Sequence, residues 1–281
     1  MRLGITMFAT DHAMPPHELA VAAEERGFAS LYVPEHTHIP VARTTPPPTG
    51  DQTLPDQYAR TLDPFVGLAA AAAVTSRITL GTGICLLAQR EPIVTAKAVA
   101  TLDHISAGRF VLGVGYGWNV EEAADHDVPW RRRREVVREK VLAMRELWTS
   151  EEASYDGEFA RFEPSWAWPK PARRTPIMLG GAAGPTLFSH IAEYGDGWMP
   201  IGGAGVRAAL PRLAQAYDAA GRDPATAAVI PFGTEPTPEK LDYYAGLSYE
   251  GLGIEEVVLR LPSGSADAVL PTLDSYAKYL S

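Results

Sequence analysis

Apolar and polar positions alternate along the chain in two repeating patterns, short apolar runs and longer amphipathic stretches. The apolar runs typical of strands are 3–9, 30–36, 78–87, 109–118, 176–181, 197–200, 227–233 and 255–262. Helical stretches separate them and begin near Pro16, Asp63, Pro92, Pro129, Gly184, Gly205, Pro238 and Ser265. Several of these starts carry a proline, which suits the first turn of a helix. The chain therefore predicts eight successive strand–helix units.

The strands of these units are mostly apolar on both faces, which is typical of a parallel sheet covered by helices. Eight such strands can close a barrel, so we expect an α/β protein with a single (β/α)8 TIM barrel over residues 1–281. Two connections are too long for plain loops. Residues 37–60 follow the second strand, carry five prolines and predict a covering segment. Residues 152–175 precede the fifth strand and predict a hairpin that turns at Asp156-Gly157.

Two strands end in alternating glycines. Gly113, Gly115 and Gly117 occupy every second position, and Gly81 and Gly83 repeat the pattern one strand earlier. Side chains alternate across a strand, so each run leaves one face bare. Such glycines mark either a bend at a barrel corner or a close approach to the backbone, which fits a flat ligand. Neither run matches the G-x-G-x-x-G dinucleotide fingerprint.

A small-residue turn follows the fifth strand in "IMLGGAAGPTL", residues 177–187. Free backbone amides at a helix N-terminus favour an anion, and small residues allow it to approach. The turn from Gly181 to Gly184 therefore predicts a phosphate site, with a tight turn that binds nothing as the alternative.

Charge and composition narrow the function classes. The net charge of −9 argues against nucleic acid, which requires a concentrated positive field. The run Arg131–Arg134 is expected on a solvated helix face, with Arg131 pairing Glu135. A single cysteine, Cys85, allows no intramolecular disulfide and is expected in the core. Neither the N-terminus nor "LAAAAAV" is long enough to span a membrane, so we expect a cytoplasmic protein.

The expected carboxyl ends of the strands, where this barrel class places its chemistry, are poor in charged groups. His36 is the one imidazole at a predicted strand end, and the adjacent Glu35 is expected to be a structural or orienting group. Further metal ligands are missing around His36 and His38, so no metal is expected. No G-x-S-x-G elbow supports a serine triad. The remaining candidate for this mouth is a planar aromatic cofactor.

The motifs resemble the luciferase-like flavin and deazaflavin oxidoreductase superfamily, particularly its branch that uses coenzyme F420. The matching stretches are "YVPEH" (32–36), "LGTGI" (80–84), "REPIVTAKAVATLDHISAGRFVLGVGYGWN" (90–119), "LGGAAGP" (179–185) and "YGDGWMP" (194–200). The resemblance runs from the first strand to about residue 200.

The resemblance implies hydride transfer between F420 at the barrel mouth and a small organic substrate, by a chain expected to form a homodimer. It also implies a non-prolyl cis peptide at Gly83–Ile84, as a bulge behind the cofactor ring. The residues expected to bind the cofactor are Gly83, Ile84, Gly115, Tyr116, Gly117, Gly181, Ala182, Ala183 and Gly184. His36 is the candidate catalytic residue, with the alternative that it only hydrogen-bonds the ring or the covering segment. Phe8, Trp118 and Trp198 are expected around the substrate, although either tryptophan could be plain core.

The chain departs from the sugar-phosphate dehydrogenases of this branch at two positions. Trp118 stands where they carry an acid after the fourth-strand glycines, and Pro40 replaces a tryptophan that follows the histidine. Oxidation of a sugar phosphate is therefore not expected. A reductase, or an oxidation of a more apolar substrate, fits better. The alternatives are an FMN-dependent monooxygenase and a non-catalytic barrel that binds the cofactor.

Overall fold

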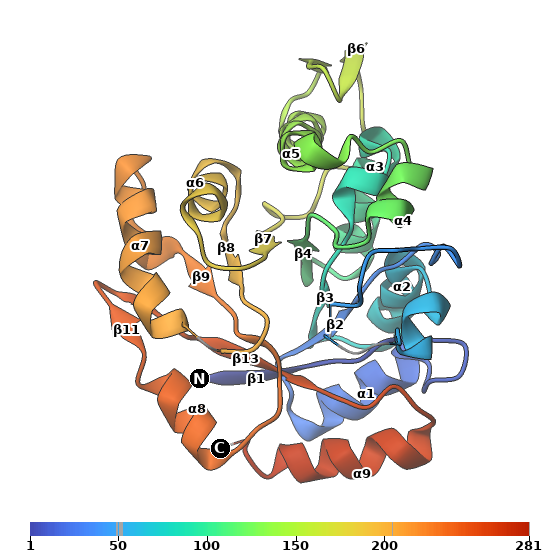
Figure 1. The fold of residues 1–281 in the computed structure, drawn as a ribbon, viewed down its shortest axis with the longest axis vertical. Helices are drawn as coiled ribbons and strands as arrows, with labels where there is room; N and C mark the ends of the chain where they lie inside the picture. The colour runs from blue at the N-terminus through green and yellow to red at the C-terminus, as the bar shows by residue number, and fades with distance from the viewer. Residues whose placement is uncertain (49, 51–52, 204, 281) are drawn as a thin grey trace.

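The computed structural model describes residues 1–48, 50, 53–203 and 205–280, and Figure 1 shows its ribbon. In these residues nine parallel strands form one sheet in the order β10-β13-β1-β2-β3-β4-β7-β8-β9. The strands are β1 (Arg2–Thr6), β2 (Ser30–Val33), β3 (Thr79–Thr82), β4 (Phe110–Val114), β7 (Ile177–Gly180), β8 (Gly197–Met199), β9 (Ala228–Val229), β10 (Phe232–Thr234) and β13 (Glu256–Arg260). The α/β class and the parallel sheet are confirmed.

The sheet curls because its two ends belong to one stretch of chain (Figure 1). β9 and β10 are separated only by Ile230 and Pro231. The Ile230 amide donates to the Trp198 carbonyl at 2.9 Å, and the Pro231 carbonyl accepts from the Val258 amide at 2.9 Å. The strand expected over 227–233 is thus divided in two at a proline, which has no amide hydrogen for a ladder.

Helices and short 3-10 turns surround the curled sheet, most of them on its outer side (Figure 1). They are α1 (Pro16–Arg26), α2 (Pro64–Val74), α3 (Pro92–Ile105), α4 (Val120–Asp125), α5 (Arg133–Thr149), α6 (Pro185–Tyr194), α7 (Val206–Ala219), α8 (Pro238–Ala245) and α9 (Ala266–Ala277), with the 3-10 turns η1 (Asp56–Arg60), η2 (Leu87–Gln89), η3 (Trp130–Arg132) and η4 (Pro224–Thr226). Seven helices begin at or one residue after the predicted start. α5 begins later, because η3 follows Pro129 first. The sequence patterns missed α4 altogether.

Two antiparallel pairs lie outside the main sheet. β5 (Ala153–Asp156) and β6 (Arg161–Ser165) form a hairpin in the predicted region, with β6 labelled at the top of Figure 1. The predicted turn at Asp156-Gly157 is wrong, because Asp156 pairs with Arg161 and residues 157–160 form the loop. β11 (Ser248–Tyr249) and β12 (Leu252–Gly253) form a shorter pair that the patterns did not predict. Within the described residues no helix combines the length and the apolar character needed to cross a bilayer.

The proline-rich segment after β2 packs against α4, which follows β4. The amides and hydroxyls of Thr44 and Thr45 all donate to the Glu121 carboxylate, at 2.6–3.2 Å. Residues 49, 51 and 52 of the predicted covering segment lie outside the described residues. The described part of the segment therefore lies at the carboxyl end of the sheet.

Candidate functional site

His36 lies three residues beyond β2, where its side chain is only 6% exposed. Its Nδ1 lies 2.9 and 3.1 Å from the two carboxylate oxygens of Glu122, and its Nε2 accepts a hydrogen bond from Trp118 Nε1 at 3.3 Å. A carboxylate only accepts and an indole N–H only donates. This pattern therefore fits the neutral imidazole that carries its proton on Nδ1.

Glu122 is the site residue that the sequence analysis missed. It lies in the first turn of α4, where the Asn119 side chain caps the helix by accepting from the amides of Glu121 and Glu122. The spacing from Asn119 to Glu122 is that of a capping box, in which the glutamate would bond back to the cap. Glu122 instead crosses to His36, with 1% of its surface exposed. The spacing of Asn119 and Glu122 is a sequence signal for the start of α4, but it does not indicate that Glu122 pairs with His36.

Glu35, the neighbour of His36, points away from this group. Its carboxylate accepts from the Leu86 amide at 2.7 Å and from Arg90 Nε at 2.5 Å. The expectation of a structural role for Glu35 is confirmed.

Aromatic rings surround His36 on its open side. The ring of Tyr58, from η1, lies 5.4 Å from His36, 4.8 Å from Phe8 and 6.0 Å from Trp118, centre to centre. The Trp118 ring lies 5.8 Å from that of His36, whereas Phe8 is joined to this group through Tyr58, a residue of the covering segment that the sequence analysis did not name. Trp198 is 2% exposed, which agrees with the alternative that it is a core residue.

The Trp198 indole N–H instead donates to the Gly181 carbonyl at 2.9 Å, and its ring packs 5.3 Å from that of Phe188. Trp198 therefore lies beneath the small-residue turn and not on a pocket wall. A full indole ring was expected at the mouth only because the residue ends a strand, and strand ends do not tell which face a side chain takes.

The glycine-lined strand ends are filled by the protein's own side chains and backbone. A Cβ on Gly115 would lie 2.3 Å from Ile84, and one on Gly180 would lie 3.2 Å from it. A Cβ on Gly113 would lie 2.1 Å from the Thr82 carbonyl oxygen, and one on Gly83 would lie 2.3 Å from Phe232. These glycines therefore do not form a bare platform for a ligand. They accommodate a bulge that carries Ile84.

The bulge itself is as the resemblance implied. The Gly83–Ile84 peptide is cis, which confirms that prediction. Ile84 remains half-buried, so one side rests on Gly115 and Gly180 while the other is accessible. Gly117 has φ +76°, and a Cβ there would lie 3.7 Å from its nearest neighbour, the side chain of Leu86.

The turn from Gly181 to Gly184 leads into α6. Ala182 and Ala183 are exposed, and Gly184 caps the helix with no side chain to satisfy the first amides. Gly181 has φ +145°, a conformation that favours glycine. The geometry fits an anion at these amides, as the sequence predicts, because the cap residue Gly184 makes no side-chain hydrogen bond to them.

Tyr116 extends the same edge of the site but is 8% exposed. Its hydroxyl is hydrogen-bonded to His190 Nδ1 at 3.2 Å and to the Tyr194 hydroxyl at 3.1 Å, both from α6. Burial raises the pKa of Tyr116 and, with the neighbouring Tyr116 hydroxyl, that of Tyr194. Both phenols therefore stay neutral and join β4 to α6.

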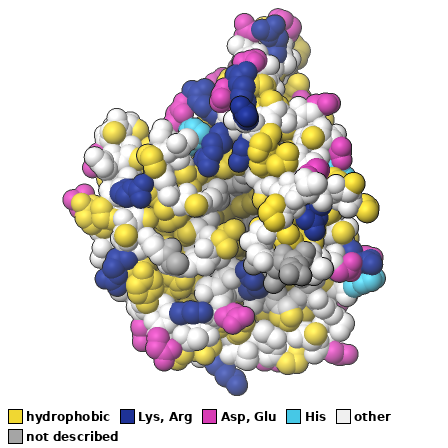
Figure 2. Space-filling model, viewed as in Figure 1, with side chains coloured by type: hydrophobic (Ala, Val, Ile, Leu, Met, Phe, Trp, Pro, Cys, Tyr) yellow, Lys and Arg dark blue, Asp and Glu magenta, His cyan; other side chains and the backbone are white. Residues whose placement is uncertain are grey.

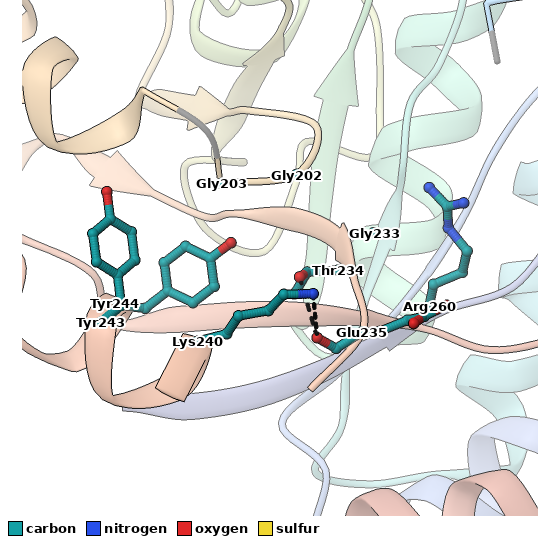
Figure 3. A pocket seen from close by; sticks show the side chains of 9 residues that line it. All are labelled: Gly202, Gly203, Gly233, Thr234, Glu235, Lys240, Tyr243, Tyr244 and Arg260. Atoms are coloured by element: carbon teal, nitrogen blue, oxygen red, sulfur yellow. Dashed lines mark hydrogen bonds between the residues drawn. The ribbon is translucent and has the colours of Figure 1, made fainter. Parts of the chain in front are cut away.

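A cavity of about 440 Å³ opens beside β10 and α8 (Figure 3). Its lining residues are Gly202, Gly203, Gly233, Thr234, Glu235, Lys240, Tyr243, Tyr244 and Arg260. Lys240 Nζ donates to the Glu235 carbonyl at 3.3 Å, while the Arg260 side chain extends away from Lys240 in the figure. The Arg260 charge also reaches Tyr58, whose pKa is raised by burial and lowered by that charge. Arg260 is the last residue of β13, so it lies at the carboxyl end of the sheet.

The space-filling view shows a hollow in the middle of the face on which the covering segment and α4 lie (Figure 2). In the described residues no three His, Cys, Asp or Glu side chains gather as a metal site would require. A buried histidine–carboxylate pair, an aromatic wall and an uncapped small-residue turn thus meet at the carboxyl end of a curled parallel sheet. This arrangement defines an α/β protein with a buried imidazole–carboxylate pair at the carboxyl end of its sheet.

Comparison with known proteins agrees with this class. Residues 11–240 match the model of the family described as luciferase-like monooxygenase, and the chain belongs to that family.

Two relatives illustrate the sequence similarity. An uncharacterized protein of Mycobacterium tuberculosis is 45% identical, over 100% of this chain and 99% of its own length. The F420-dependent hydroxymycolic acid dehydrogenase of the same species is 32% identical, over 74% of this chain and 54% of its own length. The second relative thus has nearly half of its length outside the match.

Two solved structures share the fold. The monooxygenase RslO1 from Streptomyces bottropensis has a TM-score of 0.78 and 22% identity, and covers 100% of this chain and 98% of its own. An F420-dependent secondary alcohol dehydrogenase, solved with an F420–acetone adduct, has a TM-score of 0.73 and 21% identity, with 99% and 98% covered. The fold therefore occurs both in a monooxygenase and in an F420-dependent dehydrogenase.

Proposed function

We propose that the chain is an F420-dependent oxidoreductase that transfers a hydride between the deazaflavin and a small organic substrate. The observation that carries the proposal is His36, which Glu122 orients from behind and which Phe8, Tyr58 and Trp118 surround. A buried imidazole in an aromatic mouth suits the proton transfer that accompanies hydride transfer. The relatives named as F420-dependent dehydrogenases support the choice of cofactor.

The residues present fit the cofactor at two places. Ile84, resting on Gly115 and Gly180, would support the ring, and the uncapped turn from Gly181 to Gly184 would hold the phosphate. Gly83, Tyr116 and Gly117 would complete the surroundings of the ring. When bound, the deazaflavin supplies a carbon that accepts or donates a hydride. We assign the whole of residues 1–281 to one closed (β/α)8 barrel, with covering elements after β2 and before β7.

His36 exchanges the proton at Nε2 in this proposal. In the oxidation direction a substrate hydroxyl takes the place of the Trp118 N–H and gives its proton to Nε2; in the reduction direction the imidazolium Nε2–H donates to the carbonyl oxygen. Glu122 stabilises the imidazolium through Nδ1–H in both directions. The aromatic wall excludes water, which strengthens the interaction between the two charges. Phe8 and Trp118 then contact the substrate, and the cavity beside Arg260 provides room for its remainder.

An FMN-dependent monooxygenase is the second candidate, because the fold of RslO1 covers the whole chain. A third is a barrel that binds the cofactor without turnover. That the chain is a cytoplasmic homodimer stays a prediction.

Oxygen uptake separates the first two candidates. The purified protein is mixed in air with reduced F420, and separately with reduced FMN, in an oxygen electrode. Under the proposal neither mixture consumes oxygen faster than the cofactor alone, because a deazaflavin acts chiefly as a hydride carrier. Faster uptake with reduced FMN would establish the monooxygenase. The non-catalytic barrel is tested with His36→Ala: under that candidate the substitution changes only the affinity for the cofactor.

A further inference from the structure

The arginine run at the start of α5 is divided between two environments. Arg132 pairs with Glu135 and Glu158, and the expected pair between Arg131 and Glu135 does not form. Arg133 and Arg134 are half-buried, and the salt bridges of the described residues include neither of them. The expectation of a uniformly solvated face is therefore wrong for these two residues.

Both inward arginines stack on aromatic rings and keep unused donors. The Arg133 guanidinium lies 3.8 Å from the centre of the Trp130 ring, and that of Arg134 lies 4.4 Å from the centre of the Tyr116 ring. Among the described residues, Arg133 Nε and Arg134 Nη1 are buried without a hydrogen-bond partner. Buried donors in native proteins are nearly always paired, so these two point to an acceptor that the chain itself does not supply.

The positive charge here is only partly balanced, because the charge of Glu193, which raises the pKa of His190, is itself paired with Arg138. Burial and the charge of Arg134 lower the pKa of Arg133, and the same two causes, burial first, lower the pKa of His190. Two guanidinium groups and an imidazole thus share one region, and the charge of each disfavours that of the next. An anion would relieve this repulsion.

This region lies next to the turn that we assign to the phosphate. Tyr116 follows β4, which pairs with β7, and the turn from Gly181 to Gly184 follows β7. His190 lies on α6, which begins at that turn, and contacts Tyr116. Figure 2 shows Lys and Arg side chains and a histidine on the upper rim of the hollow, between α5 and α6. A chain of anionic groups that leaves the turn can follow this rim.

We propose that Arg133, Arg134 and His190 bind the carboxylates of the oligoglutamate tail of the cofactor, and so select a tailed deazaflavin over FMN, which ends at its phosphate. The inference rests on the proposed function. Arginine suits this role because its planar fork donates two parallel hydrogen bonds to a carboxylate.

Two probes test the proposal by fluorescence quenching: F420 with several glutamates, and the same phosphorylated deazaflavin with none. Arg133→Gln/Arg134→Gln should weaken binding of the tailed probe about tenfold or more, the factor expected for losing one charge-assisted hydrogen bond. Binding of the tail-free probe should not change. Arg132→Gln is the matched control, because Arg132 already has its carboxylates, and it should bind both probes as the unaltered protein does.

Arg134→Lys and a salt titration of the unaltered protein keep the test valid if the double variant unfolds. The lysine should retain most of the preference for the tail, and rising salt should reduce that preference in the unaltered protein. If the double variant loses equal affinity for both probes, or loses none, the tail site is overturned and the proposed function still stands. If the unaltered protein binds neither probe, the proposed function fails, and the tail site with it.

Discussion

Replacing His36 with alanine should damage stability and turnover through different atoms. Glu122 is 1% exposed and its carboxylate has His36 as its hydrogen-bond partner. The alanine leaves that carboxylate buried without its donor. Adding Glu122→Gln to His36→Ala removes the stranded charge but does not return an imidazole. The double variant should therefore recover stability and stay inactive.

The size of each effect follows from the geometry. Breaking a buried pair by removing one partner costs about 3–5 kcal/mol, and we expect about 3 because water can enter the space left by the ring. At about 2–4 °C per kcal/mol this lowers the melting temperature by roughly 6–12 °C. Loss of a general acid–base group lowers turnover by about 10²–10⁴-fold. Glu122→Gln alone replaces a charge-assisted bond by a neutral one, about 1.4 kcal/mol or about tenfold in turnover.

Thermal unfolding of the four proteins at pH 7, followed by circular dichroism, measures the stability cycle. The turnover of the same four proteins with F420 measures the effect on catalysis, and their affinity for the cofactor is determined separately. If His36→Ala has the same melting temperature as the unaltered protein, the buried pair does not exist in solution. If His36→Ala turns over normally, His36 is packing.

Two further changes test the covering segment and the bulge. The pKa of Glu121 is lowered to about 2 by its hydrogen bonds, chiefly those from the threonines at 44 and 45. A depressed carboxyl pKa gives stability that is complete above the unfolded value near 4.5 and is lost as pH falls toward 2. The hydrogen-exchange protection factors in 37–60, which correct for the pH dependence of intrinsic exchange, should therefore fall over that window and approach those of Glu121→Gln at the same pH. A pH-independent difference between the two proteins would contradict this. Gly115→Ala should weaken F420 binding with little loss of stability, because it displaces the flexible end of Ile84, whereas Gly113→Ala meets a carbonyl oxygen and should cost about 1–3 kcal/mol of stability. Cofactor titration measures the first effect and denaturant unfolding the second. If Gly113→Ala weakens F420 binding more and Gly115→Ala loses more stability, the bulge does not support the cofactor.

Much of the fold could be predicted from local signals alone. Prolines at Pro16, Pro92 and Pro238 mark helix starts because a first-turn residue needs no amide hydrogen. The apolar runs identified every strand of the main sheet because a strand covered on both faces carries no alternation. Pro231 was visible in the sequence, but its division of one strand into β9 and β10 depends on how neighbours pair.

The candidate site could be predicted only where a single residue carries the signal. His36 follows from its place at a strand end, and the turn at Gly181 from its small residues. Glu122 and His36 are 86 positions apart, so their contact depends on how α4 sits over the sheet. The filling of the glycine-lined face likewise depends on side chains such as Ile84 and Phe232, which alternation along one strand cannot reveal.

Cofactor choice tests the central claim most directly. The purified protein, freed of bound chromophores, is titrated with F420 and with FMN by fluorescence quenching in moderate salt. The account predicts tight, saturable binding of F420 and binding of FMN that is weaker by about tenfold or more, since the turn at Gly181 would hold either phosphate but only F420 reaches Arg133 and Arg134. Tight binding of FMN with negligible binding of F420 would contradict it, and would assign this fold to flavin chemistry.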